Sequence, residues 1–184
     1  QFAKDMRNRD RIEWANRINV IVDSGSRKPD ALRKVTEKMS SDRVLFHVWQ
    51  ARKEGFTTNI PDYTPKADYP DEVKTFHEHG FKVMCYVCSL CAVYKSPAWE
   101  RDNVGDFFLT RKNSITAYNV GKAAFDSNLE GTLTSAKGKD QFASLKPGAF
   151  LYGDPLSRGW REYFIRIVKE FNEKCGTDAN YQDT

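Results

Sequence analysis

The chain has 184 residues and a mass of 21.2 kDa, with 40% apolar, 13% aromatic and 29% charged residues. This globular composition suits a single domain, and no apolar stretch reaches the roughly 18 residues of a membrane helix, which argues against disordered, two-domain and membrane-spanning chains. The net charge of +4 is mild and its signs are mixed, so we expect no nucleic-acid partner, because nucleic-acid binders concentrate basic residues on one face.

The first predicted element is a strand at 18–22, a short β-branched run that is continuous, as in a strand covered on both faces. A helix is expected from about 29 to 39, where Leu32, Val35 and Met39 share one face. Proline at position 29 suits the first turn of this helix.

A second apolar run at 44–49 predicts the next strand, and a polar stretch, 50–68, follows it. The pattern then predicts a helix over about 70–79, closed by Gly80 in the position of a C-terminal cap. The third strand is expected at 81–87.

The segment 89–154 is much longer than an ordinary connection, so we expect it to fold partly on itself as an inserted, irregular subdomain. Within it, 107–120 and 132–135 are predicted to pair as small antiparallel strands.

The clearest helix follows, opened either by Asp154 with the next proline or by Ser157, and closed by Gly176. One continuous apolar stripe defines its inner face: Trp160, Tyr163, Phe164, Ile167, Val168 and Phe171. The last segment, 177–184, is a plausible fourth strand.

Strands that alternate with helices indicate an α/β fold with parallel strands and right-handed crossovers. A whole (β/α)8 barrel, or TIM barrel, takes roughly 250 residues. With four strands and a long insert after the third, we predict that residues 1–184 form one domain, the first half of such a barrel. A small doubly wound α/β sheet is the alternative. Because the chain begins at Gln1 and not Met, we interpret it as a processed or excised piece.

In either architecture the working face lies at the carboxyl ends of the strands. Arg52 follows the second strand there, and the candidate site residues at this edge are Asp23, His47, Trp49, Tyr86, Asp154 and Asp183. No glycine-rich phosphate-binding motif follows the first strand, and Gly25 suits a turn, so we expect no nucleotide or other cofactor.

The cysteines Cys85, Cys88 and Cys91 form a C-x-x-C-x-x-C pattern, which occurs in zinc and iron–sulfur sites. The surrounding run is apolar, however, and has no Gly or Pro to wrap a metal. Strand geometry also directs Cys85 and Cys88 to opposite faces. We therefore favour free core thiols without a metal, which in turn favour a reducing compartment.

Carboxylates with nearby aromatic residues indicate carbohydrate chemistry. Glycoside hydrolysis uses two acids that flank the scissile bond, and Trp or Tyr stack on sugar faces. Each acid also has a structural interpretation, because Asp23 can cap the following turn and Asp154 can cap a helix.

The sequence Val48-Trp49-Gln50, the segment 60–65 (IPDYTP) and the segment 77–87 resemble the second and third strands of carbohydrate-active (β/α)8 barrels. That group includes α-galactosidase-like glycoside hydrolases. The segment 154–184 is similar to the passage in which a helix packs outside the barrel and the fourth strand carries a catalytic-site Asp to the rim.

This resemblance implies that Asp183 is the nucleophile or charge-bearing acid, and that Asp23, Trp49 and Asp154 belong to the sugar subsite. Trp49 and Tyr86 would be stacking surfaces. Ala179 stands where the family usually has Gly, a small change that suits a close-packed strand. The second acid is expected on a later strand outside this chain.

We therefore predict a fragment of a glycoside hydrolase-like enzyme with a carbohydrate substrate. A half barrel exposes two strand edges, which another chain or a second copy would cover. Two alternatives remain open: a non-catalytic carbohydrate-binding or assembly protein on the same scaffold, and a doubly wound domain that binds a small molecule or phosphate.

Overall fold

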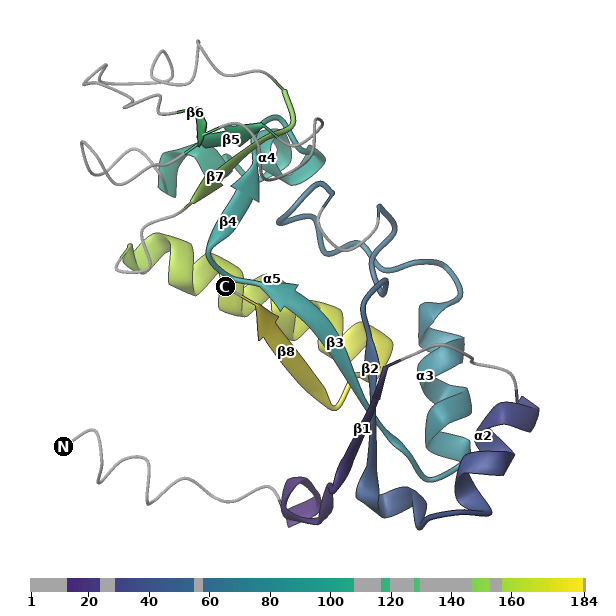
Figure 1. Cartoon of the computed structure of the whole chain (residues 1–184). Coiled ribbons are helices and arrows are strands. Elements are labelled where there is room, and N and C mark those ends of the chain that lie inside the picture. Colours follow the sequence, from purple (N-terminus) through teal and green to yellow (C-terminus); the bar gives the residue numbers. More distant parts are fainter. Residues whose placement is uncertain are drawn as a thin grey trace, which may run out of the picture.

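The main sheet of the molecule is parallel and four-stranded (Figure 1). The computed structural model describes residues 13–23, 29–54, 58–107, 117–119, 128–129, 147–152 and 157–183. The strands lie in the order β1 (Val20–Asp23), β2 (Val44–Val48), β3 (Lys82–Cys88) and β8 (Ala179–Asp183). Each of the four predicted strands is thereby confirmed, with ends shifted by one or two residues.

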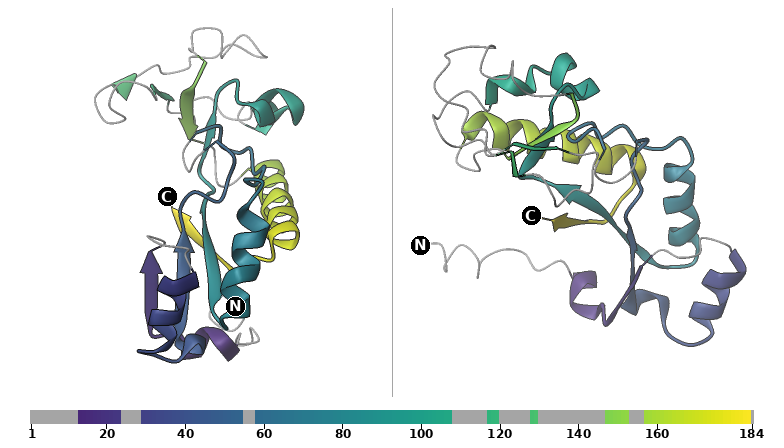
Figure 2. Two further views of the ribbon diagram at one scale, coloured as in Figure 1. Left: turned by 90° about the vertical axis from the view of Figure 1, so that its right-hand side faces the viewer. Right: turned by 45° about the horizontal axis from the view of Figure 1, so that its top comes forward.

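Helices connect the parallel strands and gather on one side of the main sheet (Figures 1 and 2). They are α2 (Pro29–Thr36), α3 (Tyr69–Glu78) and α5 (Arg158–Cys175). Two short 3-10 helices, η1 (Glu13–Arg17) and η2 (Ser41–Arg43), precede β1 and β2. Spatial order follows chain order without a reversal, whereas a doubly wound sheet reverses and carries helices on both faces. The fold is therefore part of a (β/α)8 barrel, as predicted.

A second, antiparallel sheet lies beyond the carboxyl end of β3 (Figure 1). Its order is β4 (Cys91–Val93), β7 (Ala149–Tyr152), β5 (Ala117–Asn119) and β6 (Asn128–Leu129), and α4 (Pro97–Arg101) and η3 (Val104–Phe107) also belong to this part of the chain. The strand expected within 107–120 is present as β5. Its partners are β6 and β7, and the predicted partner at 132–135 lies outside the described residues.

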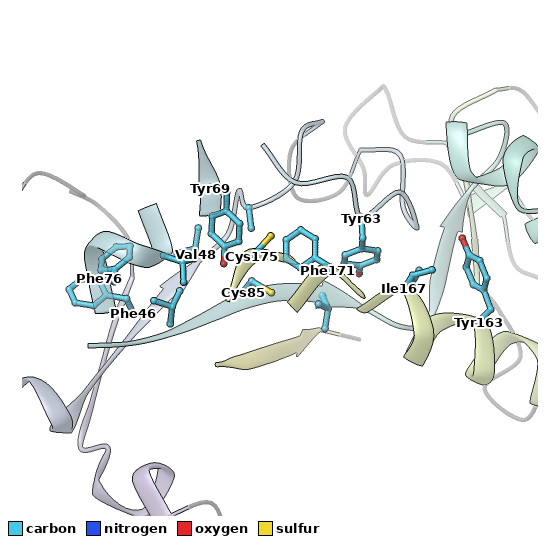
Figure 3. Close-up of a cluster of buried hydrophobic side chains, with 14 of the residues drawn as sticks. Phe46, Val48, Tyr63, Tyr69, Phe76, Cys85, Tyr163, Ile167, Phe171 and Cys175 are labelled. Atoms are coloured by element: carbon cyan, nitrogen blue, oxygen red, sulfur yellow. The ribbon is translucent and has the colours of Figure 1, made fainter. Parts of the chain in front are cut away.

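The main core fills the space between the sheet and its helices (Figure 3). Phe46 packs on Phe76 with ring centroids 4.6 Å apart, and Phe171 of α5 stacks on Tyr69 of α3 at 5.8 Å. The predicted stripe of α5 is buried at Trp160, Tyr163, Ile167 and Phe171, with Phe164 and Val168 partly buried beside it. Burial of this stripe fixes α5 against the sheet.

Both predicted glycine caps adopt left-handed backbone, with φ of 81° at Gly80 and 75° at Gly176. At the other end of α5, Ser157 is the N-cap, because its hydroxyl accepts a hydrogen bond from the Trp160 backbone N–H. The structure therefore selects Ser157 from the two predicted openings.

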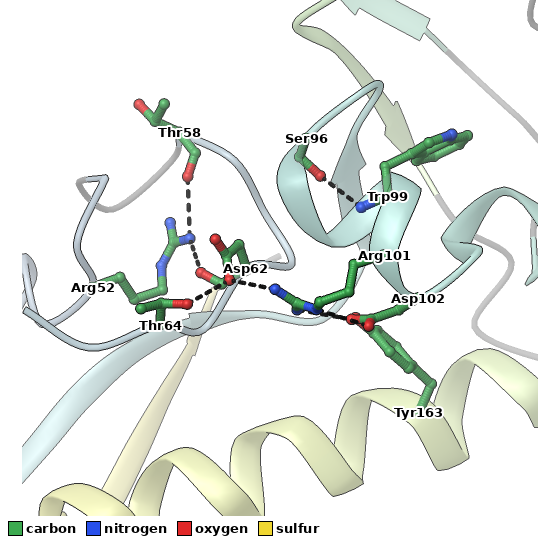
Figure 4. A network of polar contacts seen from close by, with 9 residues as sticks. All are labelled: Arg52, Thr58, Asp62, Thr64, Ser96, Trp99, Arg101, Asp102 and Tyr163. Atoms are coloured by element: carbon green, nitrogen blue, oxygen red, sulfur yellow. Dashed lines mark hydrogen bonds and ion pairs between the residues drawn. The ribbon is translucent and has the colours of Figure 1, made fainter.

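A polar network ties the segment after β2 to the helices (Figure 4). Arg52 donates from Nη1 to the carbonyl oxygens of Thr58 and Asp62, at 3.1 and 3.0 Å. The Asp62 carboxylate lies 3.5 Å from Arg101, whose Nε donates to Asp102 at 2.9 Å. Arg52 follows β2 as expected, but it is only 2% exposed and does not open onto the edge. It supports the loop from within.

Candidate functional site

The carboxyl ends of the four parallel strands bring most of the predicted site residues to one edge. The register pairs Asp23 with His47, His47 with Met84, and Tyr86 with Tyr181. Side chains alternate along a strand, and the neighbours Phe46, Val48, Cys85 and Val87 belong to the helix-side core. The paired set therefore lies on the opposite face, which is the interior face of a barrel.

Asp23 holds two neighbouring side chains through one oxygen. Its Oδ1 lies 2.9 Å from Nδ1 of His47 and accepts a hydrogen bond of 2.9 Å from Nε1 of Trp49. The Asp23 side chain is 70% exposed, whereas that of His47 is 5% exposed. An exposed carboxylate at the rim thus orients a buried imidazole below it.

The second ring nitrogen of His47 is a buried polar atom at this edge. Because Nδ1 is engaged with Asp23, Nε2 is the ring nitrogen left for a further partner. This Nε2 is buried and has no hydrogen-bond partner among the described residues. A cavity of about 310 Å³ is lined by Asp23 and His47 together with Ile21, Trp49, Met84 and Tyr181. Its volume is at the lower end of the roughly 300–1,000 Å³ typical of ligand pockets.

Three aromatic side chains form a shelf at this edge. Trp49 stacks on Tyr86 with centroids 5.3 Å apart and an interplanar angle of 28°. Tyr181 completes this aromatic shelf, 5.7 Å from Trp49 and 6.3 Å from Tyr86. Tyr181 is 39% exposed and Trp49 is partly exposed, whereas Tyr86 is only 5% exposed, so Tyr181 and Trp49 form the open part of the shelf.

Asp183 ends β8 on the same face as the aromatic shelf. It pairs in register with Cys88. Its half-buried carboxylate is close enough to the Tyr86 phenol to influence its pKa electrostatically. Burial, with the neighbouring Cys88 and Asp183, raises the pKa of Tyr86 well above its usual value, so this phenol stays neutral and can donate a hydrogen bond.

Asp23 and Asp183 stand on the two outer strands, with β2 and β3 between them. Three strand spacings correspond to about 14 Å. The two acids of a glycosidase lie only about 5–9.5 Å apart, so these two carboxylates do not form such a pair with each other.

Of the six predicted site residues, the structure brings Asp23, His47 and Trp49 together around one cavity and places Tyr86 in the shelf next to them. Asp183 lies beyond Tyr86, and Asp154 lies outside the described residues. Tyr181 was not among the predicted residues. The sequence does indicate it, because side chains two residues apart in a strand share a face, so Tyr181 lies on the same face of β8 as Asp183.

The three clustered cysteines separate as strand geometry predicts. Cys85 packs in the helix-side core, whereas Cys88 and Cys91 lie in a smaller cluster with Ile60 and Tyr86. In the part of the chain that the structure describes, no three His, Cys, Asp or Glu side chains group as metal ligands. Among the same residues, no helix is both long and apolar enough to span a membrane.

A family model described as "Domain of unknown function (DUF6259)" matches residues 2–184. No curated protein matches the chain. Among solved structures, the chain is similar to the noncanonic maltogenic alpha-amylase AmyB from Thermotoga neapolitana, with 16% identity and a TM-score of 0.52 over 93% of this chain and 40% of the amylase.

The chain is also similar to the GH31 alpha-xylosidase from Xanthomonas citri (12% identity, TM-score 0.53, 89% of this chain and 16% of the xylosidase). A third similar structure is the alpha-N-acetylgalactosaminidase NagBb from Bifidobacterium bifidum (14% identity, TM-score 0.53, 85% and 22%). The chain thus spans less than half the length of each. At these identities the likeness shows the fold, which is the barrel scaffold that these glycoside hydrolases use.

Proposed function

We propose that this chain, which belongs to the DUF6259 family, is part of a carbohydrate-processing (β/α)8 enzyme whose substrate lies along the aromatic shelf. The observation that carries this proposal is the aromatic shelf itself, held between two carboxylates at the carboxyl edge of the parallel sheet. Sugar rings have apolar faces that pack on Trp and Tyr, and hydroxyl groups that bind carboxylates.

Asp183 is the proposed reactive carboxylate, either as the nucleophile or as the group that stabilises an oxocarbenium-like state. It ends a strand at the working face and lies beside Tyr86, where a stacked sugar would present its ring. Since Asp23 is about three strand spacings away, roughly 14 Å, the second acid of the pair is proposed to lie on a later strand, outside this chain.

Asp23 and His47 are proposed to hold sugar hydroxyl groups in the cavity. Asp23 has an exposed carboxylate, and His47 lines the cavity with its buried Nε2 without a partner among the described residues. Asp154 remains a proposed subsite residue on the basis of its sequence motif alone. A relationship to α-galactosidase-like enzymes is also proposed, on the sequence motifs at 48–50, 60–65, 77–87 and 154–184.

The remaining barrel strands are proposed to come from outside residues 1–184. Within the described residues, β1 and β8 each pair on one side only, and the similar glycoside hydrolases are more than twice as long as this chain. Another chain, a second copy or further residues of the same protein would pair with these edges. We also propose that 89–154 is an inserted subdomain, with β4, β5, β6 and β7 as its sheet.

The test uses the full-length protein that carries this chain. Binding of a panel of oligosaccharides is measured by calorimetry, and hydrolysis by release of reducing sugar. Trp49→Ala should lose binding at least tenfold, and Asp183→Asn should lose turnover by 10³-fold or more while keeping binding. The matched control is Trp14→Ala, because Trp14 lies before β1 at the opposite end of the sheet, with Lys82 over its ring.

An equal loss of binding in Trp49→Ala and Trp14→Ala would contradict the shelf as the binding surface. Binding without turnover in the wild-type protein would instead indicate the non-catalytic carbohydrate-binding role. These two outcomes separate the site from the chemistry proposed for it.

A further inference from the structure

The sulfur atoms of Cys88 and Cys91 lie 2.8 Å apart, and neither is in a disulfide. Cys88 ends β3 and Cys91 begins β4, so the pair sits where the main sheet passes into the second sheet. A disulfide has a sulfur–sulfur bond of about 2.05 Å, so less than an ångström of approach separates these thiols from a bond.

The backbone around this bend is held on both sides. The Cys88 N–H donates to the Tyr63 hydroxyl at 3.0 Å, and the Ser89 carbonyl accepts from Nε1 of Trp160 at 2.7 Å. After the bend, the Val93 N–H donates to the Ile60 carbonyl at 2.6 Å. Because these contacts fix the bend, the two thiols are pre-oriented toward each other, and little entropy is lost in joining them.

We propose that Cys88 and Cys91 are a redox-active dithiol, a modification site that a small two-electron oxidant such as hydrogen peroxide converts to an intramolecular disulfide. The reaction proceeds in two steps. The Cys88 thiolate attacks one peroxide oxygen, which forms a sulfenic acid and expels hydroxide. Cys91 then attacks the Cys88 sulfur, and the sulfenic oxygen leaves as water with the Cys91 proton. Two thiols and one peroxide thus give one disulfide and two waters.

Electrostatics at the pair favour Cys88 as the first nucleophile. The hydrogen bond between the two thiols, together with the backbone N–H groups of Leu90 and Cys91, lowers the pKa of Cys88 despite its burial. The same hydrogen bond and burial raise the pKa of Cys91. One thiolate beside one thiol is the arrangement that resolving cysteines use.

Burial of the pair selects the oxidant. Cys88 is 5% exposed and Cys91 is 4% exposed, so a bulky disulfide reagent cannot reach them, whereas hydrogen peroxide is little larger than water. Cys85 provides the contrast within the same strand. Its sulfur donates to the amide oxygens of Asn172 and Asn180, and burial raises its pKa to about 12, so it is not a nucleophile at neutral pH.

The test treats the folded, reduced full-length protein with a few equivalents of hydrogen peroxide, then unfolds it, alkylates the remaining thiols and maps the peptides. Of the four cysteines in this chain, two should remain alkylatable. The peptide that contains Cys88 and Cys91 should lose about 2 Da, and dithiothreitol should restore both thiols. Cys88→Ser and Cys91→Ser should each abolish the disulfide, whereas the matched control Cys85→Ala should retain it.

Three results would overturn the proposal: four alkylatable thiols after peroxide, a disulfide between other cysteines, or a persistent sulfenic or sulfinic acid at Cys88 with Cys91 still free. The wild-type peptide map is decisive even if a variant fails to fold. Because the readout needs no carbohydrate, this proposal stands or fails independently of the proposed function.

Discussion

Trp49 is tied to Asp23 by a hydrogen bond of 2.9 Å from its indole Nε1 to the carboxylate Oδ1, which joins the end of β2 to the last residue of β1. Because the same oxygen also contacts His47, one exposed carboxylate positions both the indole of Trp49 and the imidazole below it. Asp23 is therefore a positioning residue as well as a proposed sugar ligand.

Replacing Asp23 with Ala should release the indole and weaken carbohydrate binding. A hydrogen bond is worth about 0.5–1.5 kcal/mol net, so the loss of orientation alone should reduce affinity about 2- to 10-fold. Asp23→Asn keeps an acceptor oxygen and should lose less. The measurements are calorimetric affinity and the emission wavelength of the tryptophans. Asp71→Ala, at an exposed position of α3, is the control, and equal affinities for Asp23→Ala and wild type would contradict this role.

Arg52→Met should destabilise the fold strongly, because Arg52 is buried and its guanidinium serves two loop carbonyls. Leaving buried acceptors without a donor costs about 1–3 kcal/mol each, so we expect a loss of about 2–4 kcal/mol in the free energy of unfolding. Arg158→Met removes only an exposed pair with Glu162 and should leave the free energy of unfolding almost unchanged. Urea unfolding of both variants checks the difference, and similar losses would contradict it.

Gly80→Ala should cost more stability than Gly176→Ala, although both glycines have positive φ. A left-handed backbone costs a non-glycine residue about 1–2 kcal/mol at either site. At Gly80 a Cβ would also approach Oγ of Ser41 to 2.5 Å, whereas at Gly176 its nearest neighbour is 3.7 Å away. Thermal unfolding of the two variants should therefore show the lower Tm for Gly80→Ala. Equal Tm values would show that Ser41 moves aside without cost.

Sequence periodicity predicts the barrel part of the fold well, because local signals and packing agree there. The strands 44–49 and 81–87 are runs of buried residues, and α5 carries an unbroken apolar stripe closed by Gly176. The antiparallel sheet is different. β4 is three residues long, and it pairs with β7, more than 50 residues away in the sequence. No local sequence pattern predicts this pairing.

In the candidate site, too, some residues can be predicted from the sequence and others depend on how distant segments fold together. The rule that function gathers at the carboxyl ends of parallel strands is enough to find Asp23, His47 and Trp49. It does not distinguish Trp49, which lines the cavity, from Arg52, which is buried in its own loop, because that depends on how residues 52–65 fold back. Likewise, the sequence around Cys88 and Cys91 favours separate core thiols, and only the bend between β3 and β4 brings the two sulfurs into direct contact.

Asp178 joins α3, β3 and the start of β8 through a nearly buried carboxylate. Its Oδ1 accepts from Nζ of Lys82 at 2.8 Å, and its Oδ2 lies 2.7 Å from Nε2 of His77 and accepts from the Val83 N–H at 2.9 Å. Burial alone would raise the pKa of Asp178, but the hydrogen bonds from these donors outweigh it and hold the pKa below its usual range.

A depressed carboxylate pKa has a definite consequence for stability against pH. The unfolded chain protonates Asp178 near the ordinary value of about 3.9, whereas the folded protein resists protonation. The contribution of Asp178 is therefore complete above that value and is lost as pH falls below it. Asp178→Asn should lower the free energy of unfolding at pH 7 by about 1–3 kcal/mol and flatten its decline between pH 5 and 3. Urea unfolding across this range tests both effects, with Asp71→Asn as the exposed control. An unchanged slope in Asp178→Asn would assign the acid sensitivity to other carboxylates.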